Sequence, residues 1–304
     1  MLDRSDVLRA RDAIGVRLTR TPMLPSHALR ARLKCELFQK TGSFKARGAL
    51  NKLSSLTAEE KARGVIAISA GNHAQAVAWA AAEEGADALV VMWTGASELK
   101  VAATRGYGAL VDLDADTPAT AFERLADLLV TSGRVLVHPF DDPVVIAGAG
   151  TIGLEIEEEA PDADAVVVAV GGGGLVCGIQ VAIGHRTRVI AVEPAASPAF
   201  HAALAAGKPV PVEPRSIADG LNAPFAGALP VEICREIETV LVTEAEIEHA
   251  FRFLYERAKL ACEPAGAVAA AALLSGKVVA ERPVVVVSGG NVLAETASAI
   301  LALR

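Results

Sequence analysis

The chain has 304 residues and 52% hydrophobic content, which is enough for one large core or two lobes. Its formal net charge of -7, the lack of a basic patch or tail and an aromatic content of only 4% disfavour a nucleic-acid partner. The sequence has no run of about 18 uncharged apolar residues and no charged-then-apolar leader, so we expect no membrane span and no secretory signal.

The cysteines are scattered along the chain and form no C-x-x-C pair. Such spacing favours neither a zinc site nor a disulfide framework, and it is typical of proteins in a reducing compartment. We therefore expect a cytoplasmic protein. The four positions are Cys35, Cys177, Cys234 and Cys262.

The first segment with chemical character contains Lys45. Thr41 or Ser43 is placed to cap a helix that carries Lys45 in its first turn. A helix N-terminus disfavours a cation and so lowers the pKa of a lysine, and the neutral amine is the form that attacks an aldehyde to give a Schiff base. Spacing alone does not separate Lys45 from an ordinary solvated lysine.

Apolar runs and helical stretches alternate along the rest of the chain. Continuous apolar strands between helices indicate a parallel sheet covered on both faces, and in such folds ligands bind at the carboxyl ends of the strands. Alanine-rich stretches predict helices over 74–84 and 118–130. Strands are predicted over 65–68, 88–92, 135–137, 165–170, 189–192 and 284–287.

Three of the predicted strands end in polar or glycine-rich junctions that lead toward helices. The junctions are Ser69–His73 (SAGNH), Gly171–Gly174 (GGGG) and Ser288–Asn291 (SGGN). Because the carboxyl ends of parallel strands meet at one edge of a sheet, we predict that all three junctions face one cleft.

The glycine tract, Gly171–Gly174, indicates a phosphate site. A loop without side chains leaves its backbone N–H groups bare at the positive end of the following helix. Leu175 follows where a nucleotide P-loop needs lysine, and Val176 or Cys177 stands where the G-x-G-x-x-G fingerprint needs its last glycine. A tightly packed glycine turn is the plain alternative. A phosphate site combined with a candidate imine-forming lysine points to pyridoxal phosphate (PLP).

Seven motifs extend this pattern over nearly the whole chain: GSFKARGA (42–49), SAGNHAQ (69–75), HPFDD (138–142), GGGGL (171–175), SIADG (216–220), EPAG (263–266) and SGGN (288–291). In this order they resemble the fold-type II PLP-dependent enzymes, specifically the threonine/serine dehydratase and serine racemase group.

The resemblance implies an α/β fold of the tryptophan synthase β type, with two doubly wound parallel-sheet lobes and the cofactor between them. Residues 1–47 and 145–304 would form the large PLP-binding domain, and residues 48–144 an inserted small substrate-binding domain. The lobes would close on the substrate about hinges near Gly48 and Asp142. A homodimer is expected by analogy.

The resemblance also implies the residues that hold the cofactor. Lys45 would be the Schiff-base lysine and the catalytic residue, and Phe44 would pack against the cofactor. Asn72 would hydrogen-bond the phenolic oxygen, Glu263 would lie near the ring and the substrate, and Ser288 would lie at the pyridine nitrogen. The phosphate would be held by the backbone N–H groups of Gly171, Gly172, Gly173 and Gly174, next to Leu175.

The substrate carboxylate would bind a loop formed by Ser69, Ala70, Gly71, Asn72 and His73, at the N-terminus of a helix. For His73 we favour the alternative that it contributes only its backbone, and we expect Arg47 to form a structural ion pair. A serine at the pyridine nitrogen does not neutralise a pyridinium as an aspartate would. The ring is then a weaker electron sink, which favours expulsion of a β-leaving group.

Ala70 separates the two branches of the family. Related racemases resemble SSGNH, in which the second serine protonates the face opposite the lysine, whereas dehydratases resemble SAGNH as here. We therefore predict β-elimination of water from L-threonine and/or L-serine, giving 2-oxobutanoate or pyruvate and ammonia. The alternatives are a dehydratase of another β-hydroxy amino acid such as 3-hydroxyaspartate, a serine racemase, and a non-catalytic PLP-binding sensor.

A divalent cation is doubtful. Metal-binding relatives use a Glu at a strand end, a carbonyl four residues later and an Asp six residues later. Glu193 and the Ser197 carbonyl match this pattern, but Ala199 stands at the third position. Loss of one of two carboxylates weakens an oxygen site for a hard cation, so Glu193 is a weak candidate ligand and we expect weak or absent Mg²⁺ binding.

Overall fold

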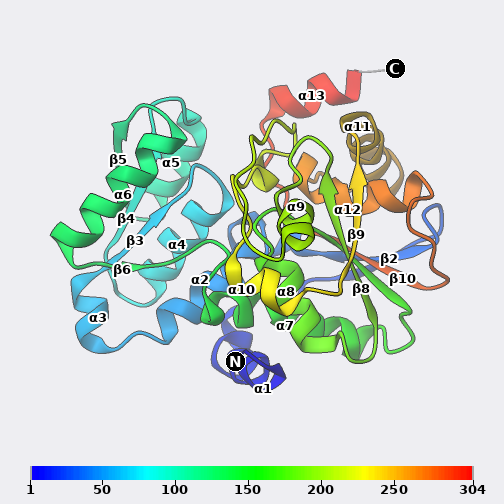
Figure 1. Ribbon diagram of the computed structural model, residues 1–304, viewed down its shortest axis with the longest axis horizontal. Helices are drawn as coiled ribbons and strands as arrows, with labels where there is room; N and C mark the ends of the chain where they lie inside the picture. Colours follow the sequence, from blue (N-terminus) through cyan, green and yellow to red (C-terminus); the bar gives the residue numbers. More distant parts are fainter. Residues whose placement is uncertain (1, 303–304) are drawn as a thin grey trace.

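The computed structural model describes residues 2–302 and contains two β-sheets flanked by helices (Figure 1). The large sheet has the strand order β1-β2-β10-β7-β8-β9, and the small sheet has the order β5-β4-β3-β6. Every strand of the small sheet lies between residues 65 and 136, whereas the large sheet draws strands from both sides of that segment. The chain therefore leaves the large sheet after β2, builds the small sheet and returns.

The large sheet is parallel except for its first strand, which pairs antiparallel with β2 at one edge. The strands predicted at 165–170, 189–192 and 284–287 are confirmed, while β1, β2 and β9 were not predicted. Pro25 in β1, Lys34 in β2 and Glu238 in β9 break the apolar runs on which the prediction relied. The strands are β1 (Met23–Ser26), β2 (Ala31–Cys35), β7 (Ala165–Ala169), β8 (Arg188–Pro194), β9 (Glu238–Val242) and β10 (Pro283–Val287).

The small sheet is parallel throughout. Its three predicted strands are confirmed, and an additional strand, β5, forms one edge. Asp112 and Asp114 alternate with apolar residues in β5, a pattern typical of a half-exposed edge strand rather than a buried one. The strands are β3 (Val65–Ile68), β4 (Ala88–Trp93), β5 (Leu110–Ala115) and β6 (Val135–Leu136).

Both faces of the large sheet are buried, as the apolar strands predicted. Successive residues of β7 enter different cores: Val167 packs with α12 and α11, whereas Val166 and Val168 pack with α7 and α8. The small sheet alternates in the same way, with Ala67 facing α4 and Ile66 facing α6. Burial of a valine side chain contributes about 1.5–3 kcal/mol, so these alternating contacts fix the register of the strands.

The helices predicted over 74–84 and 118–130 are confirmed as α4 and α6. Within residues 2–302, no helix combines the length and apolar character that crossing a membrane requires. The helices are α1 (Arg4–Ile14), α2 (Lys45–Ser54), α3 (Ala58–Arg63), α4 (Asn72–Glu83), α5 (Glu98–Gly106), α6 (Pro118–Ser132), α7 (Pro143–Glu159), α8 (Gly174–Ile183), α9 (Ala199–Ala206), α10 (Ala228–Ile233), α11 (Glu244–Phe253), α12 (Pro264–Leu274) and α13 (Ala294–Ala302).

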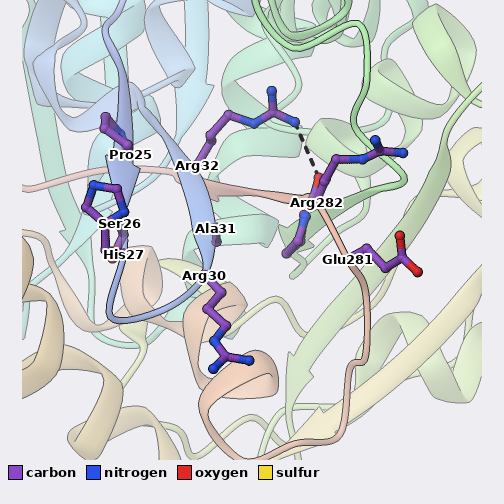
Figure 2. Close-up of a pocket in the computed structure, with 9 residues that line it drawn as sticks. Pro25, Ser26, His27, Arg30, Ala31, Arg32, Glu281 and Arg282 are labelled. Atoms are coloured by element: carbon purple, nitrogen blue, oxygen red, sulfur yellow. Dashed lines mark hydrogen bonds between the residues drawn. The ribbon is translucent and has the colours of Figure 1, made fainter.

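A surface pocket lies at the amino-terminal ends of β2 and β10, where Arg30, Arg32 and Arg282 line it (Figure 2). Arg32 forms an ion pair with Asp162, 2.6 Å long. The predicted junctions all follow carboxyl ends of strands. This pocket and the junctions predicted in the large sheet therefore lie at opposite ends of that sheet's strands.

Candidate active site

Lys45 is the first residue of α2, as predicted, but neither predicted hydroxyl caps the helix. The N-cap is Phe44, and the hydroxyls of Thr41 and Ser43 are buried without a hydrogen-bond partner within residues 2–302. The capping prediction was wrong because other contacts and backbone conformations fix both residues outside the N-cap position. Thr41 has a φ of 60°, and Ser43 is extended and forms an antiparallel bridge with Gly289.

The amine of Lys45 lies against the segment that connects β6 of the small sheet to α7. Its Nζ donates a hydrogen bond to the Pro139 carbonyl at 2.8 Å and lies 5.1 Å from the centre of the Phe44 ring. Burial lowers the pKa of Lys45 to about 8, against the opposing effect of the Glu263 carboxylate. The pKa shift has the predicted direction, but burial is its main cause. A lysine with this pKa supplies a neutral amine near neutral pH.

The loop Ser69–His73 connects β3 to α4 and offers free donors. Ser69 Oγ accepts the Gly71 N–H at 3.1 Å, which folds the loop back, and α4 has no side-chain cap. Within residues 2–302, no hydrogen bond uses the N–H groups of Asn72, His73 or Ala74 as donors. These bare N–H groups at the positive end of a 12-residue helix fit an anion such as a carboxylate.

The ring of His73 points away from this loop and into the protein. Its Nε2 lies 2.8 Å from the Val137 carbonyl, so this nitrogen carries the proton. Burial lowers the pKa of His73 to about 3, and the ring is therefore neutral. This position agrees with the alternative in which His73 contributes its backbone to the loop.

Asn72 links the loop to the two other segments at the carboxyl edge of the large sheet. Its Nδ2 donates to Glu263 Oε1 at 2.7 Å, and its Oδ1 accepts from Asn291 Nδ2 at 2.8 Å. Burial raises the pKa of Glu263 to about 7, with the charge of Asp219 adding to the effect. The predicted junctions Ser69–His73 and Ser288–Asn291 are therefore in contact. Asn291 was present in a recognised motif but was not predicted as a site residue.

Ser288 lies beside the start of α2. The Phe44 N–H donates to the Ser288 carbonyl at 3.1 Å, which fixes the strand end next to Lys45. Ser288 is 4% exposed, and no hydrogen bond within residues 2–302 uses its hydroxyl. Because this hydroxyl has no partner among these residues and is not fully enclosed by protein atoms, it is free to donate to a pyridine nitrogen.

The glycine tract is both tightly packed and rich in free donors. A Cβ on Gly172 would lie 2.2 Å from the Phe140 ring, and Gly173 has a φ of +96°, so neither position tolerates a side chain. Within residues 2–302, no hydrogen bond uses the N–H groups of Gly171–Gly174 as donors. The plain alternative of a packed turn is therefore part of the explanation, and the unpartnered N–H groups fit a phosphate as well.

Phe140 joins the glycine tract to Lys45, because the preceding residue, Pro139, accepts the lysine's hydrogen bond. The turn is held by His138 Nδ1, which accepts the N–H groups of Phe140 and Asp141 at 3.3 and 2.8 Å. The Asp141 carboxylate in turn accepts two N–H groups at the start of α10. The predicted junction Gly171–Gly174 thus lies next to the segment that binds the Lys45 amine. The motif HPFDD was recognised, but the role of its aromatic ring depends on contacts that only the fold brings together.

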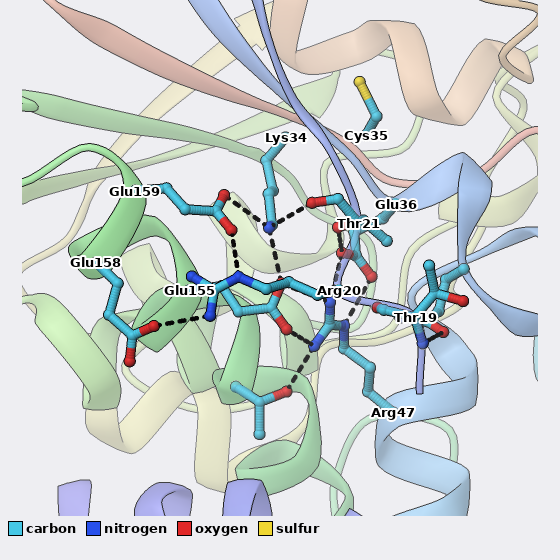
Figure 3. A network of polar contacts seen from close by, with 12 residues as sticks. Thr19, Arg20, Thr21, Lys34, Cys35, Glu36, Arg47, Glu155, Glu158 and Glu159 are labelled. Carbon is cyan, nitrogen blue, oxygen red and sulfur yellow. Dashed lines mark hydrogen bonds and ion pairs between the residues drawn. The ribbon is translucent and has the colours of Figure 1, made fainter. Parts of the chain in front are cut away.

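Arg47 is a structural residue, as predicted (Figure 3). Its guanidinium binds both oxygens of Glu36 at 2.8 Å and both oxygens of Glu155 at 2.7 and 3.0 Å. Arg47 and Glu36 are 1% and 0% exposed. Lys34 adds a second cation to Glu155 at 2.7 Å. This buried network ties α2, and so Lys45, to β2 and α7.

Besides the hydrogen bond between Asn72 and Glu263, two further contacts join the small-sheet side of the cleft to the large-sheet side. Lys100 of α5 forms an ion pair with Asp219 of the SIADG motif, and both charges influence Glu263. The Phe122 ring of α6 lies 6.1 Å from the Phe225 ring. Neither contact was predicted, because the paired residues are more than 100 positions apart and each is an ordinary surface residue in its own segment.

Glu193, the weak metal candidate, lies at the end of β8 and is 1% exposed. Its two oxygens accept the N–H groups of Phe200 and His201. Burial raises the pKa of Glu193 to about 8. Within residues 2–302, no group of three or more His, Cys, Asp or Glu side chains is arranged to hold a metal ion.

Comparison with known proteins places these observations in a family. Residues 16–290 match the family model described as pyridoxal-phosphate dependent enzyme. The chain is 43% identical over 303 residues to the catabolic L-threonine dehydratase TdcB of Escherichia coli K12, covering 94% of this chain and 92% of the relative. It is 46% identical over 267 residues to an L-threonine ammonia-lyase of Thermotoga maritima, covering 86% and 67%.

Solved structures show the same fold. The maize serine racemase superposes with a TM-score of 0.92 at 33% identity and covers 97% of this chain and 95% of its own. A tomato (Solanum lycopersicum) threonine deaminase, the processed form of isoform 2, superposes with a TM-score of 0.91 at 34% identity and covers 98% of this chain and 87% of its own. Both kinds of enzyme that the motifs resemble are thus among the similar structures.

Proposed function

The chain belongs to the pyridoxal-phosphate dependent enzyme family, and we propose that it is an ammonia-lyase that eliminates water from L-threonine and/or L-serine. The products would be 2-oxobutanoate or pyruvate, with ammonia. One observation carries this proposal: the amine of Lys45 and the glycine tract meet at the turn of Pro139 and Phe140, and the Ser69–His73 loop is joined to the same cleft by the contacts of Asn72 with Glu263 and Asn291.

We assign the cofactor's binding groups from the free donors of the site. The glycine tract, with Leu175 at the start of α8, would hold the phosphate, and Ser288 Oγ would donate to the pyridine nitrogen. Asn72, fixed by Glu263 and Asn291, would donate to the phenolic oxygen, and Phe44 would pack against the ring. When bound, the cofactor withdraws electrons from the substrate's α-carbon.

Lys45 is the residue that we assign to the proton transfer. Its Nζ, held by the Pro139 carbonyl, takes the α-proton of the substrate while the Ser69–His73 loop holds the carboxylate. Lys45 then gives this proton to the departing β-hydroxyl, which leaves as water, and hydrolysis of the resulting enamine gives the 2-oxo acid and ammonia. A pKa of about 8 lets Lys45 act as a base near neutral pH.

Elimination is favoured over racemisation because Ala70 has no group that transfers a proton. A racemase needs an acid on the face opposite Lys45. The serine racemase neighbours keep racemisation as the second candidate. For 3-hydroxyaspartate an extra cation is needed. Of the three candidate arginines, Arg47 is committed to Glu36 and Glu155 and Arg134 donates to backbone carbonyls, which leaves Arg105, exposed on α5.

The lobes would close over the substrate, with residues 48–144 moving as the small domain. The ion pair between Lys100 and Asp219 and the ring contact between Phe122 and Phe225 would be contacts of the closed form. Such closure excludes water during the elimination. Crystal forms with and without a substrate analogue that superpose as one rigid body would contradict it.

We also propose that the enzyme is a cytoplasmic homodimer. All four cysteines are free and buried, which suits a reducing compartment. Sedimentation equilibrium of the holoenzyme measures the assembly directly, and a monomer at micromolar concentration would overturn the dimer.

A panel of amino acids tests the proposed reaction. The PLP-loaded enzyme is incubated with the L and D forms of serine, threonine and 3-hydroxyaspartate, and the oxo acid, ammonia and enantiomers are measured. We expect oxo acid and ammonia in equal amounts from L-threonine or L-serine. D-serine as the main product, or no turnover of either L-amino acid, would contradict the proposal.

A further inference from the structure

Glu193 caps a helix from the end of the preceding strand. Its Oε1 accepts the Phe200 N–H at 2.8 Å, and its Oε2 accepts the His201 N–H at 2.6 Å. Helix α9 has no side-chain cap of its own, because Pro198 occupies the N-cap position. Both oxygens of one buried carboxyl group therefore fix the first turn of α9 by accepting two of its backbone N–H groups.

The first turn of α9 supports the glycine tract. Phe200 is fully buried, and a Cβ on Gly173 would lie 2.8 Å from its ring, so ring and tract are in close contact. Ser197 Oγ donates to the Leu221 carbonyl at 3.1 Å. The Leu221 backbone in turn lies 3.0 Å from where a Cβ on Gly171 would be. The segment from Glu193 to Phe200 thus supports two of the four glycines.

We propose that Glu193 is a positioning residue for binding of the cofactor's phosphate. By fixing the first turn of α9, Glu193 holds Phe200 against Gly173 and keeps this glycine in its left-handed conformation. The arrangement needs no cation, because both carboxylate oxygens already accept N–H groups and Ala199 offers no second carboxylate. This inference rests on the proposed function only in taking the glycine tract as the phosphate site.

The effect is measured as phosphate selectivity. Apoenzyme is titrated with PLP and with pyridoxal, which lacks the phosphate, and the ratio of the two dissociation constants is compared between variants. Glu193→Gln keeps the side-chain shape, but its amide nitrogen faces an N–H donor, so one of the two hydrogen bonds is lost. We expect PLP to bind about tenfold more weakly to E193Q, because a buried backbone N–H at the start of α9 loses its acceptor, while pyridoxal binds as to wild type.

Two further variants make the test specific. Phe200→Leu reduces the contact with Gly173 and leaves Glu193 unchanged. We expect the same selective loss of PLP affinity in this variant. It therefore tests the proposal independently if E193Q does not fold. Thr243→Ala removes a side-chain N-cap from α11 and should lower stability without changing the ratio.

The outcomes separate this inference from the proposed function. A wild-type enzyme that binds PLP no more tightly than pyridoxal would overturn the phosphate site itself. A selective wild type whose selectivity survives in both E193Q and F200L would overturn only the role of Glu193. Equal weakening of PLP and pyridoxal would show a general structural role and would also overturn it.

Discussion

Asn72 and Glu263, 191 residues apart in the chain, are joined by a hydrogen bond of 2.7 Å from the Asn72 amide to Glu263 Oε1. Asn72 begins the helix that follows the first strand of the small sheet, and Glu263 precedes a helix that covers the large sheet. This contact therefore joins the two sides of the cleft beside Lys45. It also places a hydrogen-bond donor and a carboxyl group of raised pKa where the cofactor ring is proposed to lie.

Replacing Asn72 with alanine should weaken cofactor binding. The change removes the donor to Glu263 and the group proposed to bind the cofactor's phenolic oxygen. Because a hydrogen bond to a charged group is worth about 1.5–3 kcal/mol, we expect PLP to bind about 10–100-fold more weakly, measured by absorbance titration of apoenzyme. Asn51→Ala is the matched control: Asn51 donates to the Val144 carbonyl at 2.7 Å, so its loss should lower stability and leave PLP affinity unchanged.

The rate at which apoenzyme captures PLP should depend on the pKa of Lys45. Burial lowers this pKa from 10.5 to about 8, and only the neutral amine attacks the aldehyde. The capture rate should therefore rise about tenfold per pH unit below pH 8 and level off above it. A stopped-flow series across pH 6–10 measures this. A rate that still rises tenfold per unit between pH 9 and 10 would show an ordinary lysine.

The Arg47 network should be far more important for stability than an exposed ion pair of similar geometry. Arg47→Met keeps much of the volume but leaves Glu36, which is fully buried, without its cation. We expect a loss of about 3–5 kcal/mol in the free energy of unfolding, measured by denaturant titration. Arg124→Met breaks a partly exposed pair with Asp112 and should cost at most about 1 kcal/mol. Equal losses would contradict the structural role of Arg47.

Ala70→Ser should introduce racemisation. A hydroxyl at this position would supply a proton to the face opposite Lys45, and general acid–base groups contribute about 10²–10⁴-fold to such steps. We expect D-serine formation from L-serine to rise about 10²-fold above the wild-type background, measured by chiral chromatography. Ala70→Gly changes the side chain without adding a hydroxyl, and D-serine at the same level in both variants would refute the assignment.

The sequence predicted the parts of the fold that local chemistry determines. Buried apolar strands such as Ala165–Ala169 and Val65–Ile68 are visible as continuous runs, because both of their faces are covered. Edge strands are not visible in this way, because one of their sides is open to solvent and accepts polar residues or proline. The segments of β5 and β1 therefore show no apolar run: they contain Asp112 and Asp114, and Pro25. The prediction that Lys45 lies in the first turn of a helix is confirmed, but the predicted cap was wrong, because a bridge to Gly289 fixes the backbone of Ser43.

The candidate site shows the same division. Lys45, the Ser69–His73 loop and the glycine tract are short contiguous motifs, and the sequence predicts them as site residues. The residues that connect them are Asn291, Pro139 and Phe140, whose partners lie 94–250 residues away in sequence or are glycines with no side chain to show the contact. The ion pair between Lys100 and Asp219 likewise exists only once the two sides of the cleft face each other.

Chemical trapping of the lysine tests the central claim most directly. The PLP-loaded enzyme is reduced with borohydride, digested and mapped by mass spectrometry. We expect one pyridoxyl group per chain, attached to Lys45, and no such label in Lys45→Ala treated in parallel. A label on another lysine, such as Lys40 or Lys52, or a fully active enzyme with Lys45 unlabelled, would contradict the assignment of this residue and the reaction built on it.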